Sequence, residues 1–203
     1  MTPKAIKNAI ILFVITLIAG FCLGLVHEVT LEPIAAAQLA SATATYQEVY
    51  PEAASFTTTE ELEAKVAAAA EEISAQGYGN VTVDDIQEAL DAGGNVLGYL
   101  ISASSNDGYN GLVQVSVGIT NEGTLTGIGF LSIGETPGLG MKAKEPAFKD
   151  QFNGKPADTM SVVKVTPTAD NQIQAISGAS YTSNATTNAV NAAVYFYNNC
   201  LAE

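Results

Sequence analysis

The feature that most constrains this sequence is an uncharged and strongly apolar run from Asn8 to Val26. As an α-helix, these nineteen residues reach nearly across the roughly 30 Å of hydrocarbon in a bilayer, so the run predicts a transmembrane helix. Lys4 and Lys7 precede it and acidic residues follow, so the positive-inside rule places the N-terminus in the cytoplasm and the rest of the chain outside. A cleavable signal peptide is the alternative. No A-x-A pattern follows closely, which favours a retained anchor.

The sequence divides into an anchor (residues 1–30), a juxtamembrane helical region (residues 31–80) and a globular domain (residues 81–203). Pro33 suits the first turn of an Ala-rich helix that extends to Tyr50. Thr57–Glu61 is typical of a helix N-cap and predicts a second helix that runs to about Gln76. Both helices precede the part of the chain that is rich in strand-forming residues.

Three apolar or alternating runs in the middle of the chain predict β-strands: Asn95–Ser104, Leu112–Thr120 and Thr124–Ser132. The sequences between them, Asn106–Gly108 and Asn121–Gly123, are typical of tight turns. Short turns join antiparallel neighbours, so the three strands form an antiparallel meander.

The last part of the sequence predicts four further elements. They are a short helix around Pro146–Phe152, strands near Ser161–Thr166 and Gln172–Ile176, and a long helix over Thr182–Cys200. Val190, Val194 and Tyr197 form an apolar stripe on this long helix. The predicted fold class is therefore α+β, an antiparallel sheet with helices packed on it.

Charge and composition exclude several functions. The formal net charge of −13 argues against binding to nucleic acid, which needs cationic side chains, and against a domain that lies flat on anionic lipid. The two cysteines, Cys22 and Cys200, form no CxxC or zinc-like spacing, so iron–sulfur clusters, c-type haem and structural zinc have no support. The single histidine, His27, lies at the predicted membrane edge, which leaves the domain without a Ser-His-Asp arrangement.

Two glycine-containing segments are candidates for a binding site. Gly134–Gly140 follows a predicted strand, and its glycines let backbone approach a flat or phosphorylated ligand; an ordinary turn is the alternative. Ile176–Ser183 lies between a strand and the last helix, where free backbone amides attract an anion. Its Ser and Thr hydroxyls have a second interpretation, as helix caps. Glu135 either tunes a ligand electrostatically or is an ordinary surface carboxylate.

The Ser-Gly-Ala-Ser segment, followed by Tyr181–Ala185, resembles the flavinylation motif of the FMN-binding domain family. Asn110-Gly111, Gly123, Glu135–Gly140 and Phe152-x-Gly154-Lys155 occur in the same order as in that family. The resemblance implies that FMN is attached through a phosphoester to Ser180. It implies a wider set of cofactor-binding residues: Ser177, Gly178, Ala179, Ser180, Thr182, Glu135, Thr136, Gly138 and Leu139.

The sequence departs from the family pattern at two positions. The acceptor is usually Thr, whereas this chain has Ser180, whose hydroxyl forms the same ester. An Asp usually lies six residues before the acceptor, and here that residue is Gln174, a change that bears on recognition by the flavin transferase. Thr182 remains a second candidate acceptor.

With its anchor and Glu32–Ile34 segment, the whole chain is similar to the RnfG proteins of Rnf complexes, and more distantly to the NqrC proteins of the sodium-pumping NADH:quinone reductase. The resemblance implies a subunit of an ion-translocating ferredoxin:NAD⁺ oxidoreductase that relays electrons through its flavin without itself binding NAD or ferredoxin. Other membrane subunits and a flavin transferase would be its partners. The alternatives are an FMN-binding module of another extracytoplasmic electron-transfer chain and a non-redox ligand-binding domain. Neither the coupling ion nor the redox potential follows from the sequence.

Overall fold

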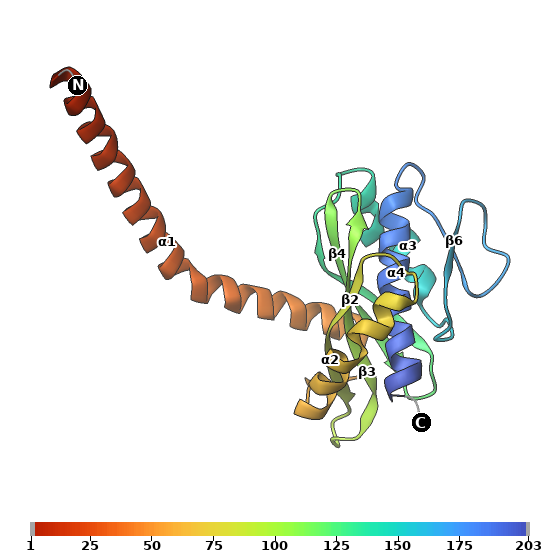
Figure 1. The fold of residues 1–203 in the computed structure, drawn as a ribbon. Helices are drawn as coiled ribbons and strands as arrows, with labels where there is room; N and C mark the ends of the chain where they lie inside the picture. The colour runs from red at the N-terminus through yellow and green to blue at the C-terminus, as the bar shows by residue number, and fades with distance from the viewer. Residues whose placement is uncertain (1–2, 202–203) are drawn as a thin grey trace. The chain divides into compact units, whose positions relative to one another are not determined.

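The computed structural model describes residues 3–201 and divides the chain into two compact units, Met1–Ala42 and Thr43–Glu203. Helix α1, Pro3–Val49, is continuous through Pro33, so the expected helix start near that residue is absent (Figure 1). A proline inside a helix removes one backbone hydrogen bond, and the Ala-rich sequence after it favours helix strongly enough to continue.

Large apolar side chains of α1 from Ile6 to Leu39 are exposed. Among the described residues, α1 is the one helix long and apolar enough to cross a membrane. An exposed apolar surface of this length is unstable in water and stable in hydrocarbon.

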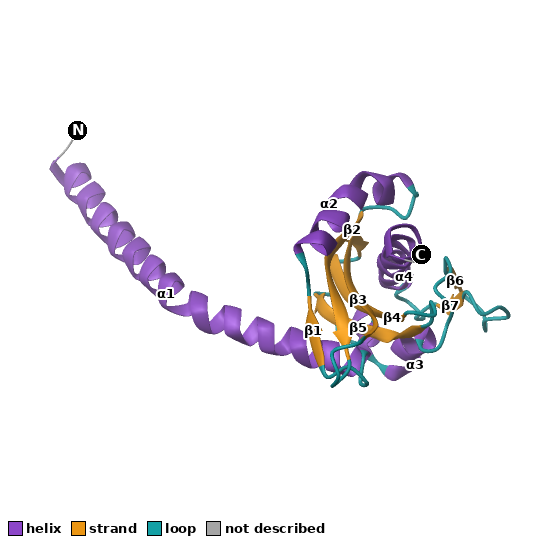
Figure 2. Ribbon diagram, turned by 90° about the horizontal axis from the view of Figure 1, so that it is seen from below, coloured by secondary structure: helices purple, strands orange, loops and turns teal. Residues whose placement is uncertain are grey.

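The second unit is built on a five-stranded antiparallel sheet whose strands follow one another in chain order (Figure 2). The strands are β1 (Ser55–Thr57), β2 (Val81–Leu90), β3 (Val96–Gly108), β4 (Gly111–Thr120) and β5 (Leu125–Ile133). The predicted three-strand meander is β3–β5. Strands β1 and β2 were not expected. In β2, two irregularities in pairing, at Val83/Asp85 and Ala89/Leu90, disrupt the alternation by which a strand is recognised.

The turn between β3 and β4 lies later than predicted. Strand β3 continues through the expected Asn106–Gly108 turn, and Gly108 pairs with Gly111 across the two residues Tyr109 and Asn110. The cause is long-range: the Asp107 carboxylate accepts a hydrogen bond from the Asn80 amide at 2.7 Å, and the Asn106 amide donates to the Asn80 carbonyl at 2.9 Å. These bonds hold the segment extended. The turn predicted at Asn121–Gly123 is confirmed.

Helix α2, Glu60–Ala75, begins where the sequence predicts, because the Thr59 hydroxyl accepts a hydrogen bond from the Leu62 amide at 3.3 Å. Helix α4, Ser180–Phe196, starts two residues earlier than predicted and continues as a π-helical turn, Tyr197–Leu201. The predicted stripe on α4 is buried, together with most of the rest of its surface.

Helix α4 lies on one face of the sheet (Figure 2) and packs its small residues against the apolar side chains of β3 and β4. The opposite face receives the end of α1 within the second unit. There a Cβ added to Gly129 would lie 2.4 Å from Cγ2 of Thr45, so the helix approaches the strand directly over a glycine. Both faces of the sheet are therefore covered.

The connection from β5 to α4 holds the remaining elements. A 3₁₀ turn (Gly140–Lys144), α3 (Pro146–Lys149) and a second 3₁₀ turn (Asp150–Phe152) follow β5. Strands β6 (Ser161–Val163) and β7 (Gln172–Gln174) then form a separate parallel pair. The predicted short helix and two short strands are present, and the pair lies outside the main sheet.

Candidate functional site

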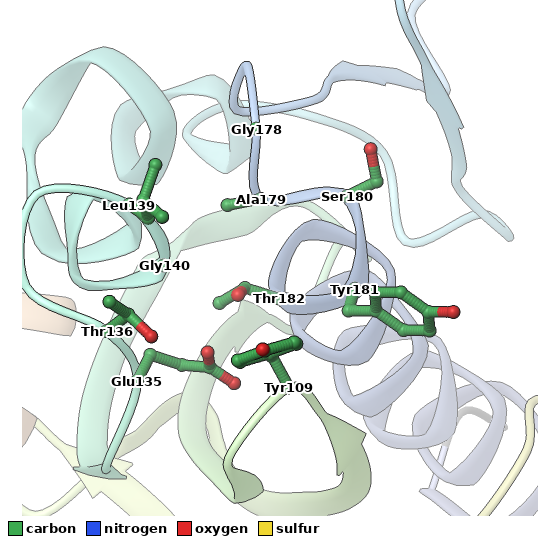
Figure 3. Close-up of a pocket in the computed structure, with 10 residues that line it drawn as sticks. All are labelled: Tyr109, Glu135, Thr136, Leu139, Gly140, Gly178, Ala179, Ser180, Tyr181 and Thr182. Atoms are coloured by element: carbon green, nitrogen blue, oxygen red, sulfur yellow. The ribbon is translucent and has the colours of Figure 1, made fainter.

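Three segments that are distant in sequence meet around one cavity of about 190 Å³ (Figure 3). They are the β3–β4 turn, the loop after β5 and the first turn of α4. The lining residues are Tyr109, Glu135, Thr136, Leu139, Gly140, Gly178, Ala179, Ser180, Tyr181 and Thr182. The two glycine-containing segments, Gly134–Gly140 and Ile176–Ser183, thus contribute facing walls of a single cavity.

Backbone hydrogen bonds and glycines shape the loop after β5, which forms one wall of the cavity. The Thr136 carbonyl accepts hydrogen bonds from the amides of Leu139, at 3.1 Å, and Met141, at 3.2 Å. Gly138 takes a left-handed φ of 77° in this turn and shapes the loop without lining the cavity. A Cβ on Gly140 would lie 2.5 Å from the Thr182 hydroxyl oxygen, so Gly140 is what lets the loop meet α4.

Glu135 is buried, with 5% of its surface exposed, so the surface-carboxylate alternative is wrong. Its Oε1 accepts a hydrogen bond from the Asn110 amide at 3.3 Å, and the Asn110 side-chain amide donates to the Gly134 carbonyl at 3.0 Å. These two bonds tie the β3–β4 turn to the loop after β5. The wall that carries Tyr109 is thereby fixed relative to the wall that carries Leu139.

The first turn of α4 has no side-chain cap, so the interpretation of its hydroxyls as helix caps is wrong. The N-cap residue is Ala179, and the Ser183 hydroxyl is used elsewhere: it donates to the Ala179 carbonyl at 2.9 Å and accepts from the Ile176 amide at 3.0 Å. The preceding Gly178 has a left-handed φ of 80°. An uncapped helix start presents backbone N–H groups and the positive end of the helix dipole. The site therefore suits an anion.

Ser180 and Thr182, the two candidate acceptors, differ in accessibility. Ser180 is half-exposed, and Figure 3 shows its hydroxyl directed away from Glu135 and Thr136. Thr182 is 1% exposed, and its hydroxyl lies against the backbone of Gly140. Ser180 is therefore the more accessible of the two residues.

A second cavity, of about 320 Å³, adjoins the first at the same turn. Ser180 and Gly178 line both cavities, and Ser177, Lys164 and Gln174 also line the second. Lys164 is the one basic residue among those that line the two cavities. Uncapped amides, a lysine and flanking glycines fit a flat ligand that carries an anionic group at Ser180. Residues 3–201 contain no cluster of three or more His, Cys, Asp or Glu side chains that could hold a metal ion.

The comparison with protein families finds two matches: residues 108–195 match the FMN-binding domain, and residues 1–49 match the RnfG N-terminal region. The RnfG protein of the Na⁺-translocating ferredoxin:NAD⁺ oxidoreductase complex of Acetobacterium woodii is 38% identical over 200 residues, which cover 95% of this chain and 91% of that protein. The chain belongs to the RnfG family.

Other members of the RnfG family match about half of the chain. The corresponding protein of the proton-translocating complex of Clostridium ljungdahlii is 39% identical over 106 residues, 52% of this chain and 56% of that protein. Among solved structures, Shewanella oneidensis NqrC aligns with 20% identity and a TM-score of 0.45, covering 52% of each chain.

RnfG proteins are subunits of ion-translocating oxidoreductase complexes, and this chain carries their FMN-binding domain. The sequence-based assignment to that family is thereby confirmed. All ten residues that line the first cavity fall within the matched range 108–195. The apolar helix lies within the matched N-terminal region, and together with the membrane complexes of the relatives it indicates membrane association.

Three lining residues are absent from the predicted set of cofactor-binding residues: Tyr109, Gly140 and Tyr181. Tyr109 was missed because the turn was expected at Asn106–Gly108. Tyr181 and Gly140 lie inside the singled-out segments, and their proximity to the cavity depends on contacts between segments that no local pattern reports.

Proposed function

We propose that this chain relays electrons through an FMN that is esterified to Ser180, as one subunit of an Rnf-type complex. The observation that carries the proposal is the position of Ser180. It is an accessible hydroxyl at an uncapped helix start, beside a cavity that lies within the FMN-binding domain match. Bound FMN supplies reversible electron transfer, which the side chains of the protein alone do not provide.

The attachment step requires a hydroxyl that an external enzyme can reach. The oxygen of Ser180 forms a new ester bond to the FMN phosphorus of a flavin dinucleotide donor. The phosphoanhydride bond of the donor breaks, and the other nucleoside monophosphate leaves with the proton of the hydroxyl. The net change is the addition of one FMN less one water. Thr182 is an unsuitable acceptor because its buried hydroxyl lies against Gly140. A flavin transferase is the partner that this step calls for.

The chain's own residues then hold the phosphate and the ring at different places. The uncapped amides of the α4 start and Lys164, across the second cavity, offset the negative charge of the phosphate. Gly178 and Ala179 leave room for the ester, and Ser177 adds a hydroxyl at its edge. Thr136 and Leu139 face the ring from the opposite wall, whose shape is set by Gly138 and by the buried Glu135.

The membrane arrangement follows from the charges around α1. Lys4 and Lys7 precede the apolar run, so the proposed N-terminus is cytoplasmic and the domain of residues 43–203 is extracytoplasmic. The other membrane subunits of an Rnf-type complex are its proposed partners. A covalent bond suits this location, since a dissociated FMN outside the cytoplasm is lost to dilution.

The test is the intact mass of the full chain purified from its native host, followed by mapping of the flavin-bearing peptide. We expect one FMN less one water on the Ser177–Asn184 peptide, with flavin fluorescence that persists after denaturation. Ser180→Ala should abolish the mass increase. Ser180→Thr, which keeps a hydroxyl, should retain it.

The matched control is Thr182→Val, which removes the other hydroxyl at nearly constant volume and should leave the attached mass unchanged. An attached flavin on Ser180→Ala, or its loss only in Thr182→Val, would move the attachment to Thr182. A native chain with no attached flavin would overturn the covalent relay and favour a domain that binds a dissociable ligand.

A further inference from the structure

Three of the five exposed large apolar side chains described in the second unit line a single cavity. Within residues 43–201, the large apolar side chains that are exposed are Tyr109, Leu112, Leu139, Val165 and Tyr181. Tyr109, Leu139 and Tyr181 line the first cavity, and Leu112 lies three residues after Tyr109 in the same hairpin. Exposed apolar groups gathered at one place indicate a binding surface.

Tyr109 and Tyr181 are the most exposed of the five, each with 70% of its surface exposed, whereas Tyr50 and Tyr197 are buried and hydrogen-bonded to backbone carbonyls. Tyr109 differs from Tyr181 in lying on the turn between β3 and β4 and not on α4. Tyr109 is the first of the two residues between Gly108 and Gly111, which pair with each other at the ends of β3 and β4. A large aromatic ring at that position contributes little to the stability of the hairpin.

The turn that carries Tyr109 is nevertheless held firmly. Its other residue, Asn110, bonds both to the buried carboxylate of Glu135 and to the carbonyl of Gly134. Gly111, directly after it, has a left-handed φ of 98°, which closes the turn. The hydrogen bonds of Asn110 therefore fix the backbone that carries the Tyr109 ring, which lines the cavity (Figure 3).

We propose that Tyr109 is the side chain on which the isoalloxazine ring of FMN stacks. The inference rests on the proposed function, since it takes FMN as the ligand of this cavity. A flat aromatic ligand gains most from an aromatic face in offset contact, and a braced ring loses little freedom when it makes that contact. Tyr109 is then a positioning residue: it orients the ring, while the ester at Ser180 holds the phosphate.

The experiment compares Tyr109→Ala, Tyr109→Phe and Leu112→Ala with the wild-type full chain. Leu112→Ala is the matched control, because Leu112 is an exposed apolar residue of the same hairpin that does not line the cavity. Flavin emission and visible circular dichroism are measured on chains shown by mass to carry one FMN. A ring stacked on Tyr109 is quenched and held in an asymmetric environment, so Tyr109→Ala should brighten the emission and weaken the dichroism.

A second measurement separates this inference from covalent attachment. Each substitution is combined with Ser180→Ala, and the binding of free FMN is titrated. Tyr109→Ala should weaken binding by about two- to tenfold, the factor that corresponds to loss of one aromatic contact, and the other two substitutions should not. Equal emission and equal affinity in wild type and Tyr109→Ala would reject the stacking. Absence of flavin from the wild type, with no binding of free FMN, would instead reject the proposed function.

Discussion

Helices α1 and α4 differ in which side chains they expose and which they bury. In the first unit, α1 exposes large apolar residues such as Phe13 and Leu23 along its length. In the second unit, α4 buries small and polar residues, among them Thr182, Ser183 and Asn191. The difference teaches that hydrophobicity alone does not report burial. The surroundings decide it: hydrocarbon accepts the apolar surface of α1, and α4 needs small side chains to lie close to a sheet.

Two of the buried polar side chains of α4, Ser183 and Asn191, have hydrogen-bond partners. Asn191 accepts a hydrogen bond from the Met160 amide at 2.8 Å and donates one to the Met160 carbonyl at 2.9 Å. Both groups of one backbone residue are therefore satisfied by one side chain inside the domain. Thr186 and Thr187 are exceptions, since their buried hydroxyls have no partner within the described residues.

Among substitutions that test this comparison, Asn191→Ala is expected to have the largest effect on stability. The substitution leaves the amide and carbonyl of Met160 buried without partners, and each costs about 1–3 kcal/mol. We expect the free energy of unfolding to fall by about 2–6 kcal/mol, measured by urea denaturation. Asn184→Ala, on an exposed position of the same helix, is the control and should change stability by less than about 0.5 kcal/mol. Equal losses in the two variants would contradict the role of burial.

A smaller effect is expected at the junction, where the chain leaves α1 and enters the sheet. Burial, with Glu52 and Glu122 nearby, raises the pKa of Tyr50 to about 12 from its ordinary 10.0. A folded-state pKa above the unfolded value favours folding below pH 10, and this contribution is lost as the pH rises toward 12. Urea denaturation across that range should show falling stability. Tyr50→Phe should reduce the slope without removing it, because burial also raises the pKa of Tyr197. An unchanged slope would show that Tyr50 does not titrate there.

The smallest effect on stability is expected from removal of residues 1–42. The residues that remain include Val49 and Tyr50, which are buried in the second unit, so its core is kept. We expect the thermal midpoint of the shortened chain to match that of the full chain in detergent, and the shortened chain to need no detergent. A chain that begins at Pro51, lacking Val49 and Tyr50, should melt lower. Similar midpoints for these two shortened chains would place the start of the folded unit later than Thr43.

Local signals in the sequence were reliable where a bond forms between near neighbours. Thr59 caps α2 as its hydroxyl and spacing indicate, and the Asn121–Gly123 turn forms where it was predicted. The turn at Tyr109 and the continuity of α1 were not predicted. The Asp107 carboxylate accepts a hydrogen bond from the amide of Asn80, 27 residues away, and no local sequence pattern predicts that contact.

The candidate site was predicted in part for the same reason. Its two glycine segments could be recognised singly, because tight turns have local signatures. Two contacts of the site depend on the tertiary fold, because the sheet brings distant segments together. Gly140 lies against Thr182, and the Asn110 amide donates to Glu135. The burial that separates Ser180 from Thr182 is likewise a property of the packed helix start, which sequence spacing alone leaves open.

The uncapped start of α4 would link binding of the proposed cofactor to the thermodynamics of folding. Ser183 braces the turn by bonding to Ile176 and Ala179, and this leaves the helix start without a capping side chain of its own. An anion held there binds the native state and has no such site in the unfolded chain, so it shifts the folding equilibrium by mass action. A dissociable anion stabilises the domain only when its free concentration is high compared with its dissociation constant. An anion fixed by the proposed ester would be present at every dilution, so attachment would stabilise the native state whatever the concentration of free cofactor.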